Sequence, residues 1–338
     1  MSARIEPLAR SGRRSLNALP LAGSAHVWFD TVRPWSGDAV RAVARGPESD
    51  RLSALRAPVA GLALDRPRIM GILNVTPDSF SDGGDLPSVE AAVTRAREMA
   101  YAADILDIGG ESTRPGADPV PETEEIARTV PVIAAIREAG LATPISIDTR
   151  KAAVAAAALD AGADIVNDVS AMSYDTAMAG LLAERDVPVC LMHAQGDPKT
   201  MQANPTYDDV VAEVADYLET RIEAALAAGI GRDRIILDPG IGFGKTLQHN
   251  VSLLRHLAVY HDLGCPILLG ASRKRFIGTL GGAEAAKDRM PGSLAVALHA
   301  AAQGVQIIRV HDVAQTRQAM NLHLALNGAP NGTEHEAD

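Results

Sequence analysis

The chain has 338 residues, of which 47% are hydrophobic and 22% charged, and this length and composition suit a globular protein with a large core. Its formal net charge of −10 argues against a nucleic-acid or anionic-membrane surface, although a local cationic pocket can lie inside an acidic protein. No apolar run reaches the roughly 18 residues of a membrane span, and Cys190 and Cys265 follow no metal-ligand spacing, so we expect a soluble protein of a reducing compartment.

Residues 1–65 differ in composition from the rest of the chain. They contain nine arginines, no lysine and both tryptophans, and Pro, Gly and Ser interrupt any periodic pattern except for a possible short helix at 38–45. A pair of arginines precedes an apolar stretch at 16–25 that resembles an export signal, but Asn17 and Pro20 interrupt this stretch. We therefore predict an accessory extension that either packs on the main domain or is disordered.

From residue 66 onward, short apolar runs alternate with amphipathic, Ala-rich segments. Eight runs have the length and composition of buried strands, at 69–75, 105–108, 145–147, 165–166, 187–192, 235–237, 267–269 and 307–310. Helical periodicity occurs between them, at 89–103, 122–139, 151–161, 208–228, 248–262, 293–302 and 316–326.

This alternation predicts the fold class. Eight strands joined by helical crossovers indicate an α/β protein with a (β/α)8 TIM barrel at 66–328, followed by a C-terminal tail at 329–338. The alternative is a doubly wound open sheet, which would usually not give eight evenly spaced units.

Polar residues stand where the predicted strands end. They are Asn74, Asp107, Asp148, Asn167, His193, Asp238, Lys274, Arg309 and His311. One such residue taken alone is commonly a helix cap or solvated surface. Because the same end of every strand in a (β/α)8 barrel carries the chemistry, the whole set indicates a binding site.

These polar residues fall into two chemical groups. Flat heterocycles with amino substituents are bound by carboxylates and amides, which here are Asp107, Asp148, Asn167 and Asp238. Phosphate oxygens are bound by cations, which here are Lys274, Arg309 and His311. The pattern therefore predicts a nitrogen heterocycle that carries a phosphate ester.

The glycine-rich run at 238–246 ends in Gly-Lys-Thr, as a nucleotide-binding P-loop does. The P-loop pattern requires a glycine at the position that Pro239 occupies, so the match fails. The alternating glycines predict a sharp turn or a close backbone approach. Phe243 among them is either a packed core ring or a wall of the ligand site.

Five motifs in chain order resemble dihydropteroate synthase. They are Leu-Asn-Val-Thr-Pro-Asp-Ser-Phe-Ser-Asp-Gly-Gly at 73–84 and the runs at 107–116, 238–245, 272–274 and 309–312. The resemblance spans about 68–326. It implies a (β/α)8 barrel and a transferase of folate biosynthesis, a sulfonamide target, which joins 6-hydroxymethyl-7,8-dihydropterin diphosphate to 4-aminobenzoate and releases diphosphate.

The resemblance also implies site residues. Those for the pterin diphosphate are Asn74, Asp107, Thr113, Asp148, Asn167, Asp238, Lys274, Arg309 and His311. Those for 4-aminobenzoate are Thr76, Pro77, Thr113, Arg114, Pro115, Phe243, Ser272 and Lys274. Catalytic roles fall to Asp148, Lys274, Arg309 and His311. Mg2+ is linked to Asn74, with water and substrate phosphate as its further ligands.

Charge suggests how such a site would work. Mg2+ and the cationic residues would stabilise departing diphosphate, Asp148 would stabilise the cationic pterin methylene left behind, and the aromatic amine would then attack. No covalent enzyme intermediate is needed. The family resemblance further implies a cytoplasmic homodimer with small-molecule substrates and no nucleic-acid or membrane partner.

Two alternatives to this function remain. Related pterin-binding methyltransferases share the barrel and much of the pterin pocket, but they do not need the phosphate-binding residues at 309–311 or the long first loop. A paralogue that has lost turnover usually lacks loop residues, and none is missing here. The chain departs from the family pattern in its N-terminal extension and at 278–291.

Overall fold

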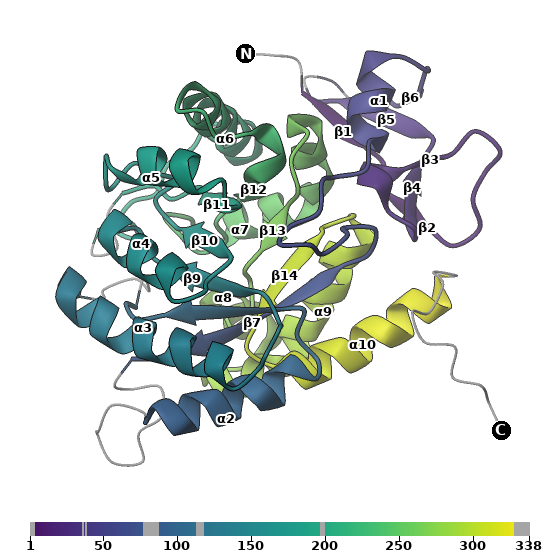
Figure 1. Ribbon diagram of the computed structural model, residues 1–338. Coiled ribbons are helices and arrows are strands. Elements are labelled where there is room, and N and C mark those ends of the chain that lie inside the picture. Colours follow the sequence, from purple (N-terminus) through teal and green to yellow (C-terminus); the bar gives the residue numbers. More distant parts are fainter. Residues whose placement is uncertain are drawn as a thin grey trace, which may run out of the picture.

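Eight parallel strands form the centre of the protein, of which the computed structural model describes residues 4–35, 37, 39–76, 88–112, 118–196 and 200–327. Neighbouring strands pair in the order β12-β11-β10-β9-β8-β7-β14-β13. A parallel bridge between Leu237 and Ile267 joins the two outer strands, so the sheet closes on itself. The prediction of a (β/α)8 barrel is confirmed (Figure 1).

The strands of the barrel lie within about two residues of the predicted runs. They are β7 (Arg68–Asn74), β8 (Ile105–Gly109), β9 (Ile145–Asp148), β10 (Ile165–Asp168), β11 (Val189–Met192), β12 (Ile235–Asp238), β13 (Leu268–Leu269) and β14 (Ile307–Val310). Their length matches the short strands that a closed barrel of this size uses.

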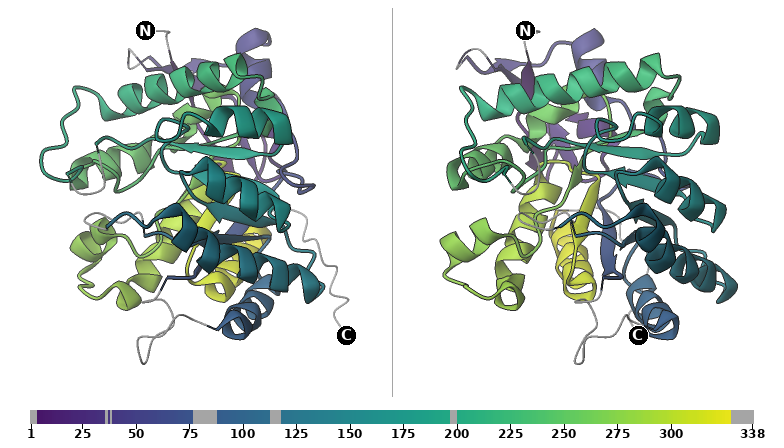
Figure 2. Two further views of the ribbon diagram at one scale, coloured as in Figure 1. Left: turned by 60° about the vertical axis from the view of Figure 1, so that its left-hand side comes forward. Right: turned by 90° about the vertical axis from the view of Figure 1, so that its left-hand side faces the viewer.

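Helices surround the strands, as the two views of Figure 2 show. They are α2 (Val89–Ala100), α3 (Glu122–Glu138), α4 (Ala152–Asp160), α5 (Met178–Arg185), α6 (Val210–Ala227), α7 (Leu247–Arg255), α8 (Arg275–Gly281), α9 (Met290–Ala302) and α10 (Val313–Leu326). Short 3-10 helices are η3 (Arg232–Arg234), η4 (Leu257–Leu263) and η5 (Ala286–Arg289). None of the described helices is long and apolar enough to cross a bilayer.

Two helices, α5 and α8, were absent from the sequence prediction. They have eight and seven residues, too few to show several turns of periodic burial. The long helix α6 shows the stronger signal: Asp209 caps its N-terminus by accepting from the backbone N of Val211, and its buried residues recur every three or four positions, at Val211, Val214, Leu218, Ile222 and Ala225.

The interior of the barrel has an apolar layer and a polar layer. The apolar layer lies toward the N-terminal ends of the strands and contains Met70, Ile105, Ile165, Cys190, Ile236, Leu268 and Ile307. Because strand side chains alternate with a period of two, the second residue after each of these faces inward again. Those next residues include Asp107, Asn167, Asp238 and Arg309. The barrel therefore carries its polar groups toward the C-terminal ends of its strands.

The N-terminal end of the barrel is covered by the segment that precedes β7. Val59 and Leu64 are buried against the apolar layer, and a bridge between Val59 and Leu62 folds the segment into a turn. This turn excludes water from the closed end. The opposite end is left for the site.

The N-terminal extension folds as two small antiparallel sheets beside the barrel (Figure 1). One contains β1 (Ile5–Pro7), β5 (Thr31–Pro34) and β6 (Arg41–Ala42); the other contains β2 (Arg10–Ser11), β4 (Val27–Phe29) and β3 (Leu19–Pro20), which leads into η1 (Leu21–Gly23). Of the two expectations for this segment, packing on the barrel is confirmed for the described residues. Arg4 pairs with Asp216 and Glu219 of α6 at 2.7 Å each.

The prediction of a short helix at 38–45 is wrong. Residues 41–42 form β6, and the helix of the extension is α1 (Pro47–Ser53). The physical reason lies in its first turn: proline at the first helical position is pre-organised for a helix, and the Ser49 hydroxyl accepts from the backbone N of Gly46 at 2.9 Å.

Candidate active site

The polar layer brings together residues from strands that are distant in sequence. Asp148 at the end of β9 is in register with Gly109 of β8 and with Asn167 of β10. The Nδ2 of Asn167 lies 3.5 Å from Oδ2 of Asp107. The three side chains are buried, so they share one low-dielectric site at the mouth of the barrel.

Arg309, one of the predicted phosphate-binding cations, is bonded to two of the carboxylates predicted to bind the heterocycle. Its Nε donates to Oδ2 of Asp107 at 2.5 Å, and its Nη2 donates to Oδ2 of Asp148 at 2.7 Å. Burial opposes the charged guanidinium, but the two carboxylates outweigh it and raise the pKa of Arg309. The sequence interpretation separated a heterocycle group from a phosphate group, whereas the structure joins them through this one side chain.

Two buried carboxylate oxygens face the site without a protein partner. Among the described residues, Oδ1 of Asp107 and Oδ1 of Asp148 accept no hydrogen bond. Buried acceptors are normally satisfied, so these atoms are suited to donors on a ligand. Burial, together with the neighbouring Asp107, raises the pKa of Asp148 to about 7, although Arg309 opposes the shift.

Lys274 is held by the glycine-rich segment that follows β12. Its Nζ donates to the carbonyl of Ile241 and lies 4.5 Å from the centre of the Phe243 ring. Burial lowers the pKa of Lys274 to about 8, and the Asp238 carboxylate opposes the shift. Phe243 is half-buried beside a cation of the site, which favours the interpretation of this ring as a wall of the site.

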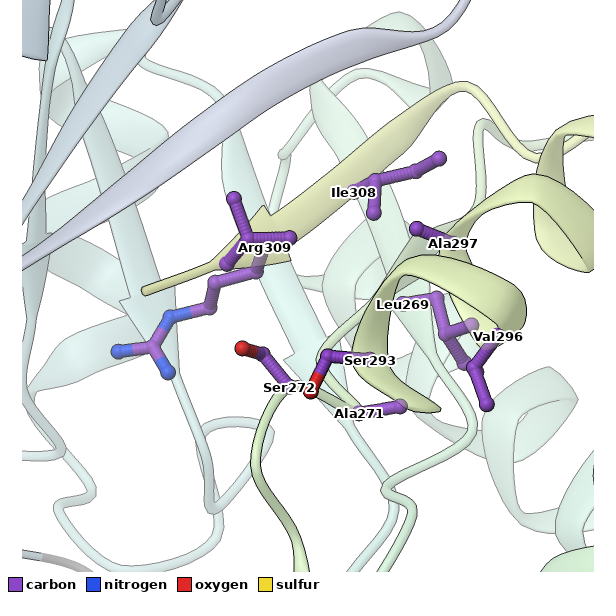
Figure 3. Close-up of a pocket in the computed structure, with 9 residues that line it drawn as sticks. Leu269, Ala271, Ser272, Ser293, Val296, Ala297, Ile308 and Arg309 are labelled. Carbon is purple, nitrogen blue, oxygen red and sulfur yellow. The ribbon is translucent and has the colours of Figure 1, made fainter. Parts of the chain in front are cut away.

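Ser272 and His311 lie on the remaining side of the mouth. Ser272 Oγ accepts from the backbone N of His311 at 3.2 Å and lies 3.1 Å from its Nδ1. Figure 3 shows the Ser272 hydroxyl on the side of Arg309, with Leu269 and Val296 beyond it. The cavity between them measures about 10 Å3, room for one water, so a larger ligand must bind in the open mouth.

Two residues at strand ends have structural partners instead. Asp168 accepts from the backbone N and the hydroxyl of Ser170 and from the backbone N of Met172, at 2.6–2.8 Å, so it caps its own loop. His193 contacts Lys245, which is buried under the glycine-rich segment. Lys245 therefore faces the protein interior and does not resemble a P-loop lysine, as the failed motif predicted.

Part of the predicted aminobenzoate set lies outside the described residues. These positions are Pro77, Thr113, Arg114 and Pro115. Thr76 is half-buried two residues after Asn74, at the end of β7. The structure thus brings together the predicted residues from β7, β8, β9, β10, β12 and β14 and from the loops after β12 and β13.

A buried ion-pair network behind the site was not predicted. Glu111 accepts from Lys151 Nζ at 3.0 Å, from the backbone N of Val120 at 3.0 Å and from Arg150 at 3.2 Å. Lys151 also pairs with Glu125 at 2.5 Å. A helical pattern gives no signal for such a network, because its partners come from separate elements.

The site offers oxygen atoms to a hard cation. A Cβ placed on Gly109 would lie 3.7 Å from Oδ1 of Asn74 and 3.8 Å from Oδ2 of Asp148, so both oxygens lie beside the end of β8. Within the described residues, no three His, Cys, Asp or Glu side chains form a metal cage. One amide and one carboxylate fit Mg2+, which keeps waters and takes phosphate oxygens as ligands.

Comparisons with known proteins agree with this geometry. The profile of the pterin-binding enzyme family matches residues 70–311. The dihydropteroate synthase of Neisseria meningitidis serogroup B is 51% identical over 271 residues, which cover 78% of this chain and 94% of the relative.

Two solved structures are also similar to the chain. The dihydropteroate synthase of Xanthomonas albilineans with 4-aminobenzoic acid has a TM-score of 0.76 and 50% identity, covering 81% of this chain and 99% of its own. The Yersinia pestis enzyme with a sulfonamide drug complex has a TM-score of 0.75 and 46% identity, covering 79% and 97%.

Proposed function

We propose roles for the site residues from one premise: the chain belongs to the pterin-binding enzyme family and is a dihydropteroate synthase, a transferase of folate biosynthesis. It joins 6-hydroxymethyl-7,8-dihydropterin diphosphate to 4-aminobenzoate and releases diphosphate. The observation that carries the roles is the position of Arg309, bonded to Asp107 and Asp148 in one buried mouth.

The pterin ring binds the carboxylates and the amide of the polar layer. A pterin carries an amino group and ring N–H groups, and these donors match the unpartnered Oδ1 atoms of Asp107 and Asp148. Asn167, Asp238 and Lys274 complete this pocket with groups that donate or accept. Burial of these groups strengthens each hydrogen bond that the ring makes.

The diphosphate binds beside the pterin, at Arg309, His311, Asn74 and Thr113. The bonds of Arg309 to the carboxylates use Nε and Nη2, and a guanidinium has further N–H groups that reach phosphate oxygens. Asn74, together with water and phosphate oxygens, would hold Mg2+, which would supply positive charge that makes diphosphate a better leaving group. Arg309 therefore connects the carboxylates of the pterin pocket to the diphosphate.

The reaction follows from this distribution of charge. Departure of diphosphate leaves a cation on the pterin methylene, which the fixed carboxylate of Asp148 stabilises. The amine of 4-aminobenzoate then attacks from the side opposite the leaving group, and the new C–N bond is left neutral when the nitrogen gives up one proton to the released diphosphate. The ring of 4-aminobenzoate packs against Phe243 and Lys274. Water is excluded by the residues that surround this ring, which are Ser272, Thr76, Pro77, Thr113, Arg114 and Pro115.

Cellular place and assembly are also proposals. Both cysteines, Cys190 and Cys265, are buried free thiols, which suits the reducing cytoplasm. The family resemblance supports a homodimer, and sedimentation equilibrium at several concentrations tests it. The methyltransferase alternative is disfavoured, because the similar proteins named above are synthases.

The test is formation of labelled dihydropteroate from the dihydropterin diphosphate and labelled 4-aminobenzoate, with and without Mg2+. We expect product that disappears when EDTA removes Mg2+ and returns when Mg2+ is restored. A sulfonamide should compete with 4-aminobenzoate. Folded protein that binds the pterin diphosphate and forms no product would instead support the paralogue that has lost turnover.

A further inference from the structure

Lys245 is the last residue of the loop that follows β12, which we call the glycine loop (residues 240–245), and its side chain is buried. Its side chain is 3% exposed. Nζ lies 2.8 Å from Nδ1 of His193 and donates to the carbonyls of Gly240 at 2.9 Å and Phe243 at 3.0 Å. Three acceptors thus lie within 3.0 Å of the amine, and a fourth, the carbonyl of His193, lies 3.4 Å from it.

This number of partners matches the chemistry of a lysine. An ammonium has three N–H donors and no acceptor, so it is satisfied when His193 is neutral and accepts at Nδ1. Burial lowers the pKa of His193 to about 2, and the adjacent lysine adds to the shift, so the imidazole is neutral. Burial also lowers the pKa of Lys245, while the Asp238 carboxylate opposes that change.

The glycine loop has a backbone that few residues adopt. Gly240, Gly242 and Gly244 have φ values of +70°, +83° and +63°. A Cβ on Gly240 would lie 1.8 Å from the carbonyl oxygen of His193, so the loop passes directly over the end of β11. Lys245 binds two carbonyls of this loop, those of Gly240 and Phe243, and the Gly240 carbonyl also accepts from the backbone N of Phe243 at 3.2 Å.

The two bound carbonyls enclose the part of the loop that reaches the site. Ile241 lies between them in sequence, and its carbonyl accepts from Lys274 Nζ. Phe243, whose own carbonyl is bound, places its ring 4.5 Å from the same Nζ. The position of Lys274 in the mouth therefore depends on the shape of this loop.

We propose that Lys245, paired with His193, is a positioning residue for the reaction, because its hydrogen bonds hold the glycine loop in the shape that places Phe243 and Lys274 in the mouth. This inference rests on the proposed roles of those two residues. Lys245 acts through them and does not itself contact substrate.

A second buried lysine among the described residues, Lys151, shows why a purely structural role fits less well. Lys151 forms ion pairs with Glu111 and Glu125 and so joins three elements by charge. Among the described ion pairs, Lys245 takes part in none, and two of its acceptors are carbonyls of its own loop. Its bonds define a local backbone shape more than they join distant elements.

The experiment compares steady-state kinetics of the full chain with Lys245→Met, a substitution that keeps an unbranched side chain one heavy atom shorter and removes its donors. We expect the KM for 4-aminobenzoate to rise about tenfold, equal to about 1.4 kcal/mol, while kcat falls less than about threefold. In a Phe243→Ala background the same substitution should raise KM by a clearly smaller factor, because one of its two targets is gone and only Lys274 remains.

A matched pair of substitutions at His193 keeps the test valid even if the Lys245→Met variant does not fold. Asn can place an acceptor oxygen near the position of Nδ1, so His193→Asn should retain the wild-type KM, whereas His193→Leu should reproduce the rise. Circular dichroism and thermal midpoints establish that each variant is folded.

Three results would overturn the proposal: a lower thermal midpoint with unchanged KM, equal effects of Lys245→Met with and without Phe243, or equal behaviour of His193→Asn and His193→Leu. Wild-type protein that makes no dihydropteroate would contradict the proposed function instead, so the two failures are distinguishable.

Discussion

Arg309 is the residue on which the charge of the site depends. Its single positive charge pairs with both Asp107 and Asp148, and burial magnifies each of these interactions. A diphosphate that competes for the guanidinium would release part of the negative charge of Asp148 at the moment when the pterin methylene becomes positive. Binding of the leaving group and stabilisation of the cation are thus coupled through one side chain.

Replacing Asp148 by asparagine tests its proposed role. Asn keeps the size and an acceptor oxygen but removes the charge, so kcat should fall about 10²- to 10³-fold, the cost of losing a fixed electrostatic group. The Kd for the pterin diphosphate, measured by calorimetry, should change much less. Equal losses in turnover and binding would contradict the role.

Asp164→Asn is the matched control for this substitution. Asp164 precedes β10 at the opposite end of the barrel and pairs with Arg137 at 2.5 Å. The same chemical change there should leave kcat at the wild-type value.

The pH dependence of kcat/KM follows from the two shifted groups. Asp148, with a pKa raised to about 7 by burial, carries its charge only above that pH, and Lys274, lowered to about 8, carries its charge only below that pH. Asp148 and Lys274 face the charged side chains of Asp107, Asp238 and Arg309, which couple the two titrations. The two pKa values therefore belong to the whole set of charged residues.

A bell-shaped profile with its maximum between about pH 7 and 8 is therefore expected for the free enzyme. Asp148→Asn should flatten the acid limb and leave the basic limb in place. An acid limb that persists in this variant would assign it to another group.

At the scale of elements, the glycine loop depends on conformations that only glycine adopts easily. Gly240→Ala would place a methyl group 1.8 Å from the carbonyl of His193 at a φ of +70°. We expect the free energy of unfolding, measured in urea, to fall by about 4 kcal/mol or more, with loss of activity, because backbone on both sides must move.

Gly282→Ala provides the comparison. Gly282 has a φ of +69° and no atom within 4 Å of an added Cβ, so it shares the backbone conformation without the close contact. The expected loss is about 1–2 kcal/mol from the left-handed conformation alone. Similar losses at both positions would show that contact with His193 contributes little.

At the scale of the whole molecule, the extension stabilises one side of the barrel and leaves the mouth open. Arg4 pairs with α6, Arg51 pairs with Asp262 of η4 at 2.5 Å, and Trp35 donates to Asp209 at 2.7 Å. A small core that includes Leu21, Phe29 and Leu52 holds the extension together. These contacts predict an effect on stability and none on chemistry.

Arg4→Ala should lower the free energy of unfolding by about 1–2 kcal/mol, because the guanidinium is buried and its carboxylate partners are partly exposed. The kinetic constants should not change. Arg10→Ala, in the same extension, removes an exposed ion pair in which Arg10 Nε lies 3.5 Å from Oδ1 of Asp30. It should lower the free energy of unfolding by less than about 0.5 kcal/mol. A change in kcat of Arg4→Ala would indicate that the extension reaches the site.

Local sequence patterns were enough to predict the barrel and most of its polar layer. Strand and helix periodicities are local, and the period of two places Asp107, Asn167, Asp238 and Arg309 two residues after inward-facing apolar residues. The same local patterns missed the short helices α5 and α8 and misplaced the helix of the extension.

Which of these residues touch one another depends on how the chain folds in three dimensions. Arg309 lies 202 residues from Asp107 and Lys245 lies 52 from His193, so no local pattern contains either pair. The closed barrel brings them together, and burial then shifts the pKa of Asp148 and Lys274. Pairing and pKa depend on neighbours in space, and for this reason they arise only once the strands have closed.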